Sequence, residues 1–333
     1  MHIHRWRNSE KIELVASGPA APPLPRKFLV FVVPHADIAS PLLNAVNRDR
    51  NFDLAVRFYE APGKNESLLS GAEFVMTGGL SKFHAASQFL ARCRLEGAYE
   101  GYLFLDGDLE FDATQLDHFL SFVHSAHLDL AQPSVSRDSY CYWKMAYHQP
   151  GYIFRDTSFV EVMAPYLSRW ALSKTLPTFT KSISTYGLDF VWPSLMGKRA
   201  IGVVDAFQVR HRDCVDYAAG SFYKYLRSID VDLVKEERLI LAEYGVRREQ
   251  AHSRRGYFWK RHWPLSGTPP ALVSVPLDGP ERKTDRQRLI DLTMRVARMR
   301  LAGGKRPEPE LAKAIRPYLS GSRISPLNPL AIP

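Results

Sequence analysis

The chain has few cysteines, and no two of them lie close together in the sequence. Its three cysteines, Cys93, Cys141 and Cys214, are widely spaced in a chain of 333 residues. Zinc knuckles and disulfide frameworks need closely spaced or even-numbered cysteines, so the sequence indicates neither. We therefore expect a reducing compartment.

The sequence also lacks the common markers of secretion, membrane insertion and phosphate-loop nucleotide binding. Its first residues, Met1 to Arg7, carry no apolar stretch like that of a signal peptide. No apolar run is long enough to span a bilayer, and neither Gly-x-Gly-x-x-Gly nor the Walker motif occurs. We expect a cytoplasmic protein and leave open peripheral contact with the inner face of a membrane.

Positive charge, in contrast, is in excess. The chain has 44 Lys and Arg against 35 Asp and Glu, a net charge of +9 and a pI of about 9.4. This balance suits an anionic ligand, an anionic membrane surface or nucleic acid, and does not choose among them. The hydrophobic share of 45% and charged share of 24% are ordinary for a globular protein.

The middle of the chain alternates between strand-like and helix-like patterns. Apolar runs rich in β-branched and aromatic residues predict strands at 28–33, 52–59 and 102–105. Apolar residues at helical spacing predict a helix over 82–93. This order predicts an α/β fold with a mainly parallel sheet. Further along, similar patterns predict one strand and two helices, at 158–163, 166–172 and 223–244.

The two ends of the chain differ from this middle part, which we expect to form one domain over 27–250. Residues 1–26 are polar and then proline-rich, and we interpret them as a flexible leader. Residues 251–333 are predicted to be a basic, partly helical extension with a proline-rich tail. Its stretch 254–263 and its amphipathic helix over 285–301 have the composition of segments that bind anionic lipid or nucleic acid, although most such charge runs are solvated faces.

The most informative segment is an apolar strand that ends in two aspartates. Asp106 and Asp108 are separated only by Gly107, directly after Tyr102–Leu105. Ligands of open α/β sheets bind at the carboxyl ends of the strands, and two carboxylates placed there repel each other unless a cation lies between them. Mg²⁺ and Mn²⁺ are bound by one or two carboxylates together with substrate phosphates. The segment therefore predicts a metal–nucleotide site.

The same spacing occurs in phosphatases of the haloacid type, where the first aspartate is the nucleophile. In this alternative, Asp106 would attack the phosphate. A threonine or valine usually follows the second aspartate in that family, whereas Leu109 and Glu110 follow here. The phosphatase is therefore the weaker of the two enzyme hypotheses.

Two basic residues are candidates for the same site. His211 follows the strand that ends at Asp205, and its imidazole would complete the coordination shell of a metal. The alternative is a half-buried histidine between two arginines, which would share the opposite face of a strand. Lys82 follows a glycine pair and would neutralise a diphosphate, or else face solvent.

Two acidic residues are candidates for catalysis. Asp189 follows Gly187 and would act as a general base towards an acceptor hydroxyl, or else simply interact with a helix N-terminus. Glu161 lies inside an apolar run, and a lone buried acid is unfavourable. We therefore expect Glu161 at a sheet edge or in a functional pocket.

Together and in this order, these segments resemble an uncharacterised family of glycosyltransferase-like proteins, domain of unknown function 707. The resemblance covers roughly residues 28–215 and rests on Phe104–Asp108, Gln132–Pro133, Phe159–Pro165, Gly187–Asp189 and Gly202–His211. The chain departs from the family where other members have longer acidic runs than Asp-Gly-Asp. Many members also have a tryptophan at the position of Tyr186.

The resemblance implies a GT-A-like fold, in which a Rossmann-type mixed sheet is flanked by helices, and a nucleotide-sugar donor bound through Mn²⁺ or Mg²⁺. Asp106 and Asp108 would hold the metal and donor, with His211 as a third metal ligand. Asp189 would be the base beside the acceptor, and Glu161 would contact the sugar or the acceptor.

The leading hypothesis is therefore a metal-dependent glycosyltransferase. Its acceptor would be a surface polysaccharide, a lipopolysaccharide-type glycan or another glycoconjugate, including a lipid-linked one. The basic extension would contact an anionic membrane, and nucleic acid is not an expected partner. A third hypothesis is a non-catalytic protein that binds polyanions through that extension, with steeply salt-dependent affinity.

Overall fold

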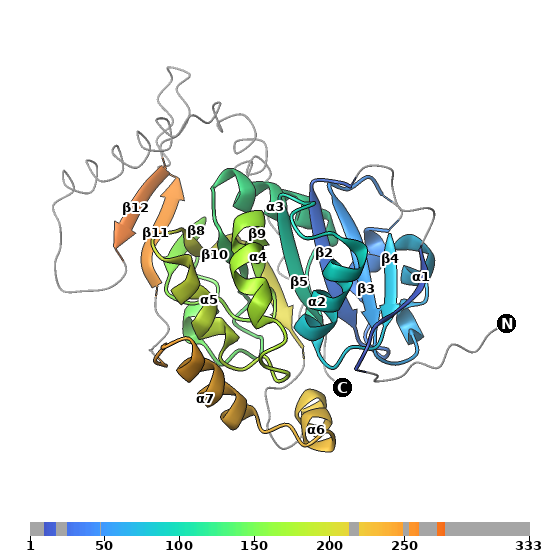
Figure 1. Cartoon of the computed structure of the whole chain (residues 1–333). Coiled ribbons are helices and arrows are strands. Elements are labelled where there is room, and N and C mark those ends of the chain that lie inside the picture. Colours follow the sequence, from blue (N-terminus) through green and yellow to red (C-terminus); the bar gives the residue numbers. More distant parts are fainter. Residues whose placement is uncertain are drawn as a thin grey trace, which may run out of the picture.

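A computed structural model of the chain describes residues 10–17, 25–46, 48–212, 220–248, 253–259 and 272–276. In these residues one large mixed sheet is covered by helices (Figure 1). The predicted fold class, α/β with a mixed sheet flanked by helices, is confirmed. Among the described helices, none combines the length and apolar character needed to cross a membrane.

Strands and helices alternate over much of the chain. The strands, in chain order, are β1 (Glu13–Ser17), β2 (Phe28–Pro34), β3 (Phe52–Phe58), β4 (Phe74–Thr77), β5 (Gly101–Gly107), β6 (Leu109–Glu110), β7 (Leu130–Val135), β8 (Phe154–Thr157), β9 (Tyr166–Ser168), β10 (Ile201–His211), β11 (Ser253–Trp259) and β12 (Leu272–Pro276). The α-helices are α1 (Leu68–Gly71), α2 (Lys82–Cys93), α3 (Leu116–Ser125), α4 (Arg169–Thr175), α5 (Leu188–Met196), α6 (Ser221–Ser228) and α7 (Leu233–Glu243). Short 3-10 helices are η1 (Pro41–Asn44), η2 (Gly63–Asn65), η3 (Ala113–Gln115), η4 (Lys144–Ala146) and η5 (Leu176–Thr178).

The parallel part of the sheet contains the point at which the strand order reverses. β4, β3, β2 and β5 are neighbours in that order and run parallel. The chain builds outward from β2 to β4 and then returns to place β5 on the other side of β2. In Rossmann-type sheets, ligands bind in the crevice at the carboxyl ends of the strands at this switch point. Here Val33 pairs with Asp106 and Pro34 with Gly107 at that position.

The other part of the sheet is mainly antiparallel. β9 lies between β5 and β7 and is antiparallel to both, while β10 is parallel to β7. β8, β11 and β12 then extend the sheet with antiparallel pairs. The carboxyl end of β10 leaves this path and pairs with β6, where His211 lies opposite Leu109. This pairing returns the end of β10 to the segment directly after Asp108.

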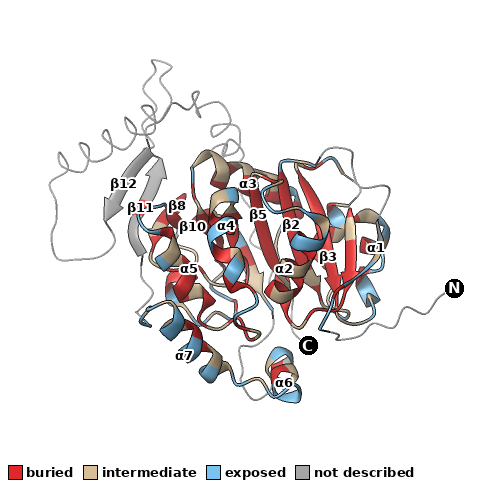
Figure 2. Cartoon of the chain, in the orientation of Figure 1, coloured by how far each residue is buried: buried red, intermediate tan, exposed pale blue. Residues whose placement is uncertain are grey.

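Alternation along the central strands divides the core into two faces. The strands themselves are buried, β3 at all seven positions (Figure 2). Phe31 and Phe104 belong to the core beneath α2, α4 and α5. Val30 and Leu103 belong to the core beneath α3. Because strand side chains alternate between faces, Asp106, two residues after Phe104, emerges on the α2 side.

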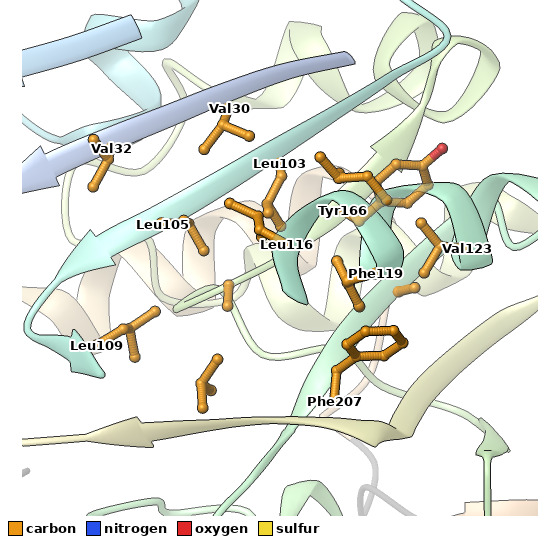
Figure 3. Close-up of a cluster of buried hydrophobic side chains, with 14 of the residues drawn as sticks. Val30, Val32, Leu103, Leu105, Leu109, Leu116, Phe119, Val123, Tyr166 and Phe207 are labelled. Carbon is orange, nitrogen blue, oxygen red and sulfur yellow. The ribbon is translucent and has the colours of Figure 1, made fainter. Parts of the chain in front are cut away.

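Figure 3 shows the core on the α3 side. Phe119 and Val123 of α3 lie in the same cluster as Leu105 of β5 and Phe207 of β10. The rings of Phe119 and Phe207 meet edge to face with their centroids 5.5 Å apart, a favourable geometry for aromatic pairs. This packing joins the parallel and antiparallel parts of the sheet into one core.

The sheet extends beyond both predicted boundaries of the 27–250 domain. β1, inside the predicted leader 1–26, pairs antiparallel with β4. β11 and β12, inside the predicted extension 251–333, continue the sheet from β8. The predicted helix over 285–301 lies outside the described residues.

Most predicted elements between 28 and 105 are confirmed, but three later ones differ from the structure. The predicted strand over 158–163 is irregular, and β9 begins only at Tyr166, where a helix was predicted. Pro165 lacks the N–H that a ladder needs. The predicted helix over 223–244 is two helices, because Asp230 takes a left-handed φ of 57° and Asp232 caps α7.

Candidate functional site

The Asp-Gly-Asp turn lies at the switch point between β2 and β5. The Asp106 side chain is 38% exposed, although the strand behind it is buried. A Cβ atom at Gly107 would overlap the carbonyl oxygen of Val33 and lie 2.7 Å from the Cα of Pro34. Only glycine therefore allows β2 and β5 to approach this closely between the two aspartates.

Lys82 holds Asp106 from the first turn of α2. Its Nζ donates to Asp106 Oδ1 at 2.6 Å and to the carbonyl oxygens of Val162 and Met163 at 2.6 and 3.3 Å. These acceptors use all three donors of the ammonium group. The side chain is only 7% exposed, so the solvent-facing alternative is wrong. A diphosphate could bind Lys82 only if one of these bonds were given up.

His211 holds Asp108 in the same way. Its Nε2 lies 3.0 Å from Asp108 Oδ2, and its Nδ1 lies 2.9 Å from the carbonyl oxygen of Tyr140. Although burial lowers the pKa of His211, the hydrogen bond and charge of Asp108 raise it to about 9. Arg210 and Arg212 point away to Glu110, as the alternation in the sequence predicted. His211 therefore faces the site as an imidazolium.

The pKa values of the two aspartates diverge. Burial raises the pKa of Asp106 above its usual value, although the charge of Lys82 opposes this. Burial also acts on Asp108, but the hydrogen bond from His211 outweighs it and lowers the pKa of that carboxyl. Asp108 is therefore the more firmly ionised member of the pair.

The donor set suits a hard divalent cation in part. Such ions are held by one or two carboxylates when substrate phosphates supply the remaining oxygens, which Asp106 and Asp108 allow. Within the described ranges, no three or more His, Cys, Asp and Glu side chains are grouped as metal ligands. His211 presents no lone pair while both of its ring nitrogens donate, so its role as a metal ligand stays a prediction.

Glu161 belongs to the same group of residues, and its position at a sheet edge or in a functional pocket stays a prediction. Its backbone N–H donates to Gln132 Oε1 at 2.6 Å, and its Oε2 accepts from Cys141 Sγ at 3.2 Å. Burial raises the pKa of Glu161 to about 7. The charges of His211 and Asp106 act on it, so it belongs electrostatically to the same cluster.

Asp189 lies in the first turn of α5, where its role as a general base stays a prediction. It is at a helix N-terminus, yet its Oδ1 is buried and has no hydrogen-bond partner in the described structure. Burial, followed by the negative charges of Glu161 and Glu237, raises the pKa of Asp189 to about 8. A carboxyl group of this kind is mostly protonated at neutral pH and half-ionised near pH 8, close to the range in which a general base operates.

The turn before Asp189 has an unusual backbone and is fixed by α7. Thr185 and Gly187 have positive φ values of 66° and 85°, and a β-branched residue rarely adopts this conformation. Glu236 of α7 accepts hydrogen bonds from the backbone N–H groups of Ile183 and Ser184 at 3.0 and 2.7 Å. The helix therefore supports a strained turn that positions the carboxyl group.

Sequence reasoning missed three contributors to the site. The carbonyl group of Tyr140, the thiol of Cys141 and the carboxylate of Glu236 all contact or support the predicted residues. The first two lie in the segment 136–152, which is rich in aromatic residues. They belong to no motif, and only its unusual aromatic content marked the segment.

Two other polar groupings do not join this site. Asp205, the acid at the earlier strand end, bonds Arg155 at 2.6 Å, and both side chains are fully buried. A hollow of about 390 Å³ lies near the amino end of β3, where Arg48 pairs with Asp117 at 2.6 Å. It is lined by Arg48, Asp49, Arg50, Asn51, Thr114, Asp117 and His118.

No protein-family model and no curated protein sequence matches the chain, so its membership of the domain of unknown function 707 family stays a prediction. Some solved structures are similar over part of their length. TarS from S. aureus, in complex with UDP-GlcNAc, aligns with 66% of this chain and 71% of its own, at 15% identity and a TM-score of 0.38.

GalNAc-T7 with UDP, GalNAc and Mn²⁺ aligns with 66% of this chain and 58% of its own, at 8% identity and a TM-score of 0.42. A197 from STIV aligns with 56% of this chain and 85% of its own, at 14% identity and a TM-score of 0.32. At these values the likeness assigns neither an activity nor a substrate to this chain.

Proposed function

We propose that the chain is a metal-dependent glycosyltransferase that moves a sugar from a nucleotide-sugar donor to a glycan or glycoconjugate acceptor. The observation that carries the proposal is the position of Asp106 and Asp108 at the β2/β5 switch point. This crevice binds ligands in Rossmann-type sheets. A carboxylate pair in it suits the diphosphate of a donor bridged by a divalent ion.

The residues around the aspartate pair have separate roles in such a transfer. Asp106 and Asp108 would hold Mn²⁺ or Mg²⁺, which would neutralise charge on the leaving diphosphate. Lys82 and His211 orient the two carboxylates from behind. Asp189 accepts the proton of the acceptor hydroxyl group, since its pKa of about 8 lies close to neutral pH. Glu161, on which the charges of His211 and Asp106 act, would contact the sugar or the acceptor.

A haloacid-type phosphatase is the second candidate because of one contact. An aspartate nucleophile is commonly held by a lysine, and Lys82 bonds Asp106 at 2.6 Å. That hypothesis expected the lysine downstream of the nucleophile, whereas Lys82 precedes it. The order of the residues therefore favours the transferase.

Thermal unfolding with a panel of nucleoside diphosphates, with and without Mn²⁺, tests the proposal. We expect one nucleotide to stabilise the wild-type protein only with the metal, and the effect to vanish in the Asp106→Ala/Asp108→Ala double variant. Glu243→Ala, which alters an exposed ion pair with Lys181, is the matched control. A nucleotide effect that survives the double substitution, or none at all, would contradict the proposal. Phosphate release from p-nitrophenyl phosphate that depends on Asp106 would establish the phosphatase instead.

We also propose that the basic extension brings the enzyme to an anionic membrane carrying a lipid-linked acceptor. The support is the Arg-rich polar face predicted for 285–301, with Arg288, Arg295 and Arg298. Replacing these three arginines with glutamate should abolish co-sedimentation of the full chain with vesicles containing phosphatidylserine. Unchanged sedimentation would contradict this localisation.

A further inference from the structure

Two tyrosine rings are exposed at the rim of the candidate site. Tyr140 is 50% exposed and Tyr142 is 60% exposed. Among the described residues, the only other large aromatic side chain in the exposed class is Phe222, at 38%. Single exposed apolar residues are ordinary on protein surfaces. Two large rings within three residues, beside a cluster of ionisable groups, call for a functional explanation.

The backbone that carries these rings is held in place by contacts with the site itself. The carbonyl group of Tyr140 faces His211, and the thiol of Cys141 donates to Glu161. The hydroxyl group of Tyr147 reaches the carbonyl oxygens of Ser139 and Cys141 at 3.3 and 3.2 Å. Exposed rings on a fixed backbone form a preorganised contact surface, which loses little conformational entropy when a ligand binds.

An aromatic path leads from this rim towards Asp189. The ring of Tyr142 meets Trp143 edge to face at 4.9 Å. Trp143 in turn contacts Phe159 at 4.8 Å and Phe190 at 5.6 Å. Phe190 is the chain neighbour of Asp189, so these ring contacts end at the helical turn that carries the proposed base.

The charges around the rim favour a neutral ligand. The candidate site beside the rings holds the carboxyl groups of Asp106, Asp108 and Glu161, which outnumber the two cations that bond the aspartates, so a polyanion without a divalent ion would meet excess negative charge. Arg210, which precedes His211, is already paired with Glu110 and Asp138 at 3.1 and 3.0 Å. Single-stranded nucleic acid also stacks on tyrosine, but it brings phosphates that these acids repel.

We propose that the rings of Tyr140 and Tyr142 form the acceptor platform of the enzyme and stack against the C–H faces of pyranose rings in a neutral glycan. Aromatic side chains suit this task because they pair an apolar face with a polar edge. The inference rests on the proposed function and adds the acceptor's class and the residues that select it. Tyr140 and Tyr142 would be specificity-determining residues, and the chemistry would stay with Asp189.

The test measures glycan binding and donor binding separately on the full chain. The glycan probe is a set of neutral tri- and tetrasaccharides of glucose, galactose and N-acetylglucosamine, detected by saturation-transfer NMR in the presence of the stabilising nucleotide and Mn²⁺. The Tyr140→Ala/Tyr142→Ala variant should bind its best saccharide about tenfold more weakly, because both stacking contacts are lost. The Tyr140→Phe/Tyr142→Phe variant keeps the rings and should bind like wild type.

Measuring nucleotide binding in the same variants distinguishes failure of this inference from failure of the proposed function. Stabilisation by the nucleotide and Mn²⁺ should be the same in all these variants, because neither ring contacts the aspartate pair. If the nucleotide stabilises but no saccharide binds wild type, or the alanine variant binds equally well, the platform is refuted while the transferase stands. Tight binding of oligothymidine in place of saccharides would refute the platform in favour of nucleic acid. Loss of the nucleotide effect in wild type refutes the proposed function itself.

Discussion

The two sides of the candidate site are built by different means. Asp106 and Asp108 follow a parallel strand, and the ladder between β2 and β5 fixes their positions. Glu161 lies on an irregular segment and accepts a hydrogen bond from the Cys141 thiol, whereas Asp189 follows a turn whose backbone N–H groups donate to Glu236. A backbone ladder tolerates many substitutions in its side chains, whereas a side-chain clamp depends on single residues. The strand-end side should therefore be sensitive mainly at Gly107, Lys82 and His211, and the loop side should be sensitive wherever a side-chain clamp is lost.

The substitution Lys82→Met should have the largest effect and would break the strand-end side. It removes the donor to Asp106 and to the Val162 carbonyl oxygen, whereas the Met163 carbonyl oxygen keeps the backbone N–H of Asp106. We expect the free energy of unfolding to fall by about 2–3 kcal/mol, since Asp106 is partly solvated. Urea denaturation measures the change. Lys181→Met, which breaks an exposed pair with Glu243, should leave stability unchanged. Equal stability of both variants would show that the Lys82 bonds are dispensable.

The substitution Gly187→Ala should break the loop side. Its φ of 85° is strained for alanine, and the new Cβ would lie 2.6 Å from Ile240 Cγ2 of α7, so we expect a loss of about 1–3 kcal/mol. Gly197 is a matched control, because it has a φ of 60° but no atom within 4 Å of the added Cβ. Thermal unfolding should show a smaller loss for Gly197→Ala. Identical losses would mean that strain alone, and no contact with α7, restricts the turn.

The ionisation of Asp189 should make both the transfer rate and the stability depend on pH. Because only the ionised carboxyl accepts a proton, transfer should rise with pH up to about 8, the pKa of this group. Stability should move the opposite way. Because the pKa of Asp189 is higher in the folded than in the unfolded protein, its protonated carboxyl group favours the folded state. This contribution to the free energy of unfolding is present at low pH and is lost as pH rises through about 8.

The variant Asp189→Asn tests both signs. It should abolish the rising limb of the rate profile, and it should be more stable than wild type at pH 8 but not at pH 5. Thermal unfolding across this pH range gives the comparison. A wild-type rate independent of pH between 6 and 8 would remove Asp189 from the role of base.

The substitution Cys141→Ala should have the smallest effect. Loss of the thiol removes a weak donor to Glu161, worth under about 1 kcal/mol, and should raise the pKa of Glu161 because that bond favours its ionised form. Cys141→Ser keeps a donor and is the control. Carboxyl titration by infrared spectroscopy should show the shift only in the alanine variant.

The same contrast explains how far sequence reasoning could go. The strands around Asp106 are visible as local apolar runs, and the acids at their ends follow from the chain order. Asp189 was also found locally, from its glycine neighbour. The contact between Cys141 and Glu161 spans 20 residues, and that between Tyr140 and His211 spans 71. Periodicity carries no information about such pairs.

Lys82 shows a second limit of prediction from the sequence. Its position at the start of a helix after two glycines made it a candidate for a diphosphate. The structure instead shows its ammonium group bonded to Asp106 and to the carbonyl oxygens of Val162 and Met163. Those carbonyls lie on the segment mistaken for a strand, so no reading of α2 alone could have found them.

The support of the Asp189 turn by α7 has a consequence for biosynthesis. Asp106 lies on the fifth strand, whereas Glu236 belongs to a helix far along the chain. At typical elongation rates, a ribosome needs on the order of ten seconds to pass from one to the other. During that interval the nascent chain carries the aspartate pair without the helix that holds the opposite wall. The strand-end side thus emerges first, and the site becomes complete only after α7 has left the exit tunnel.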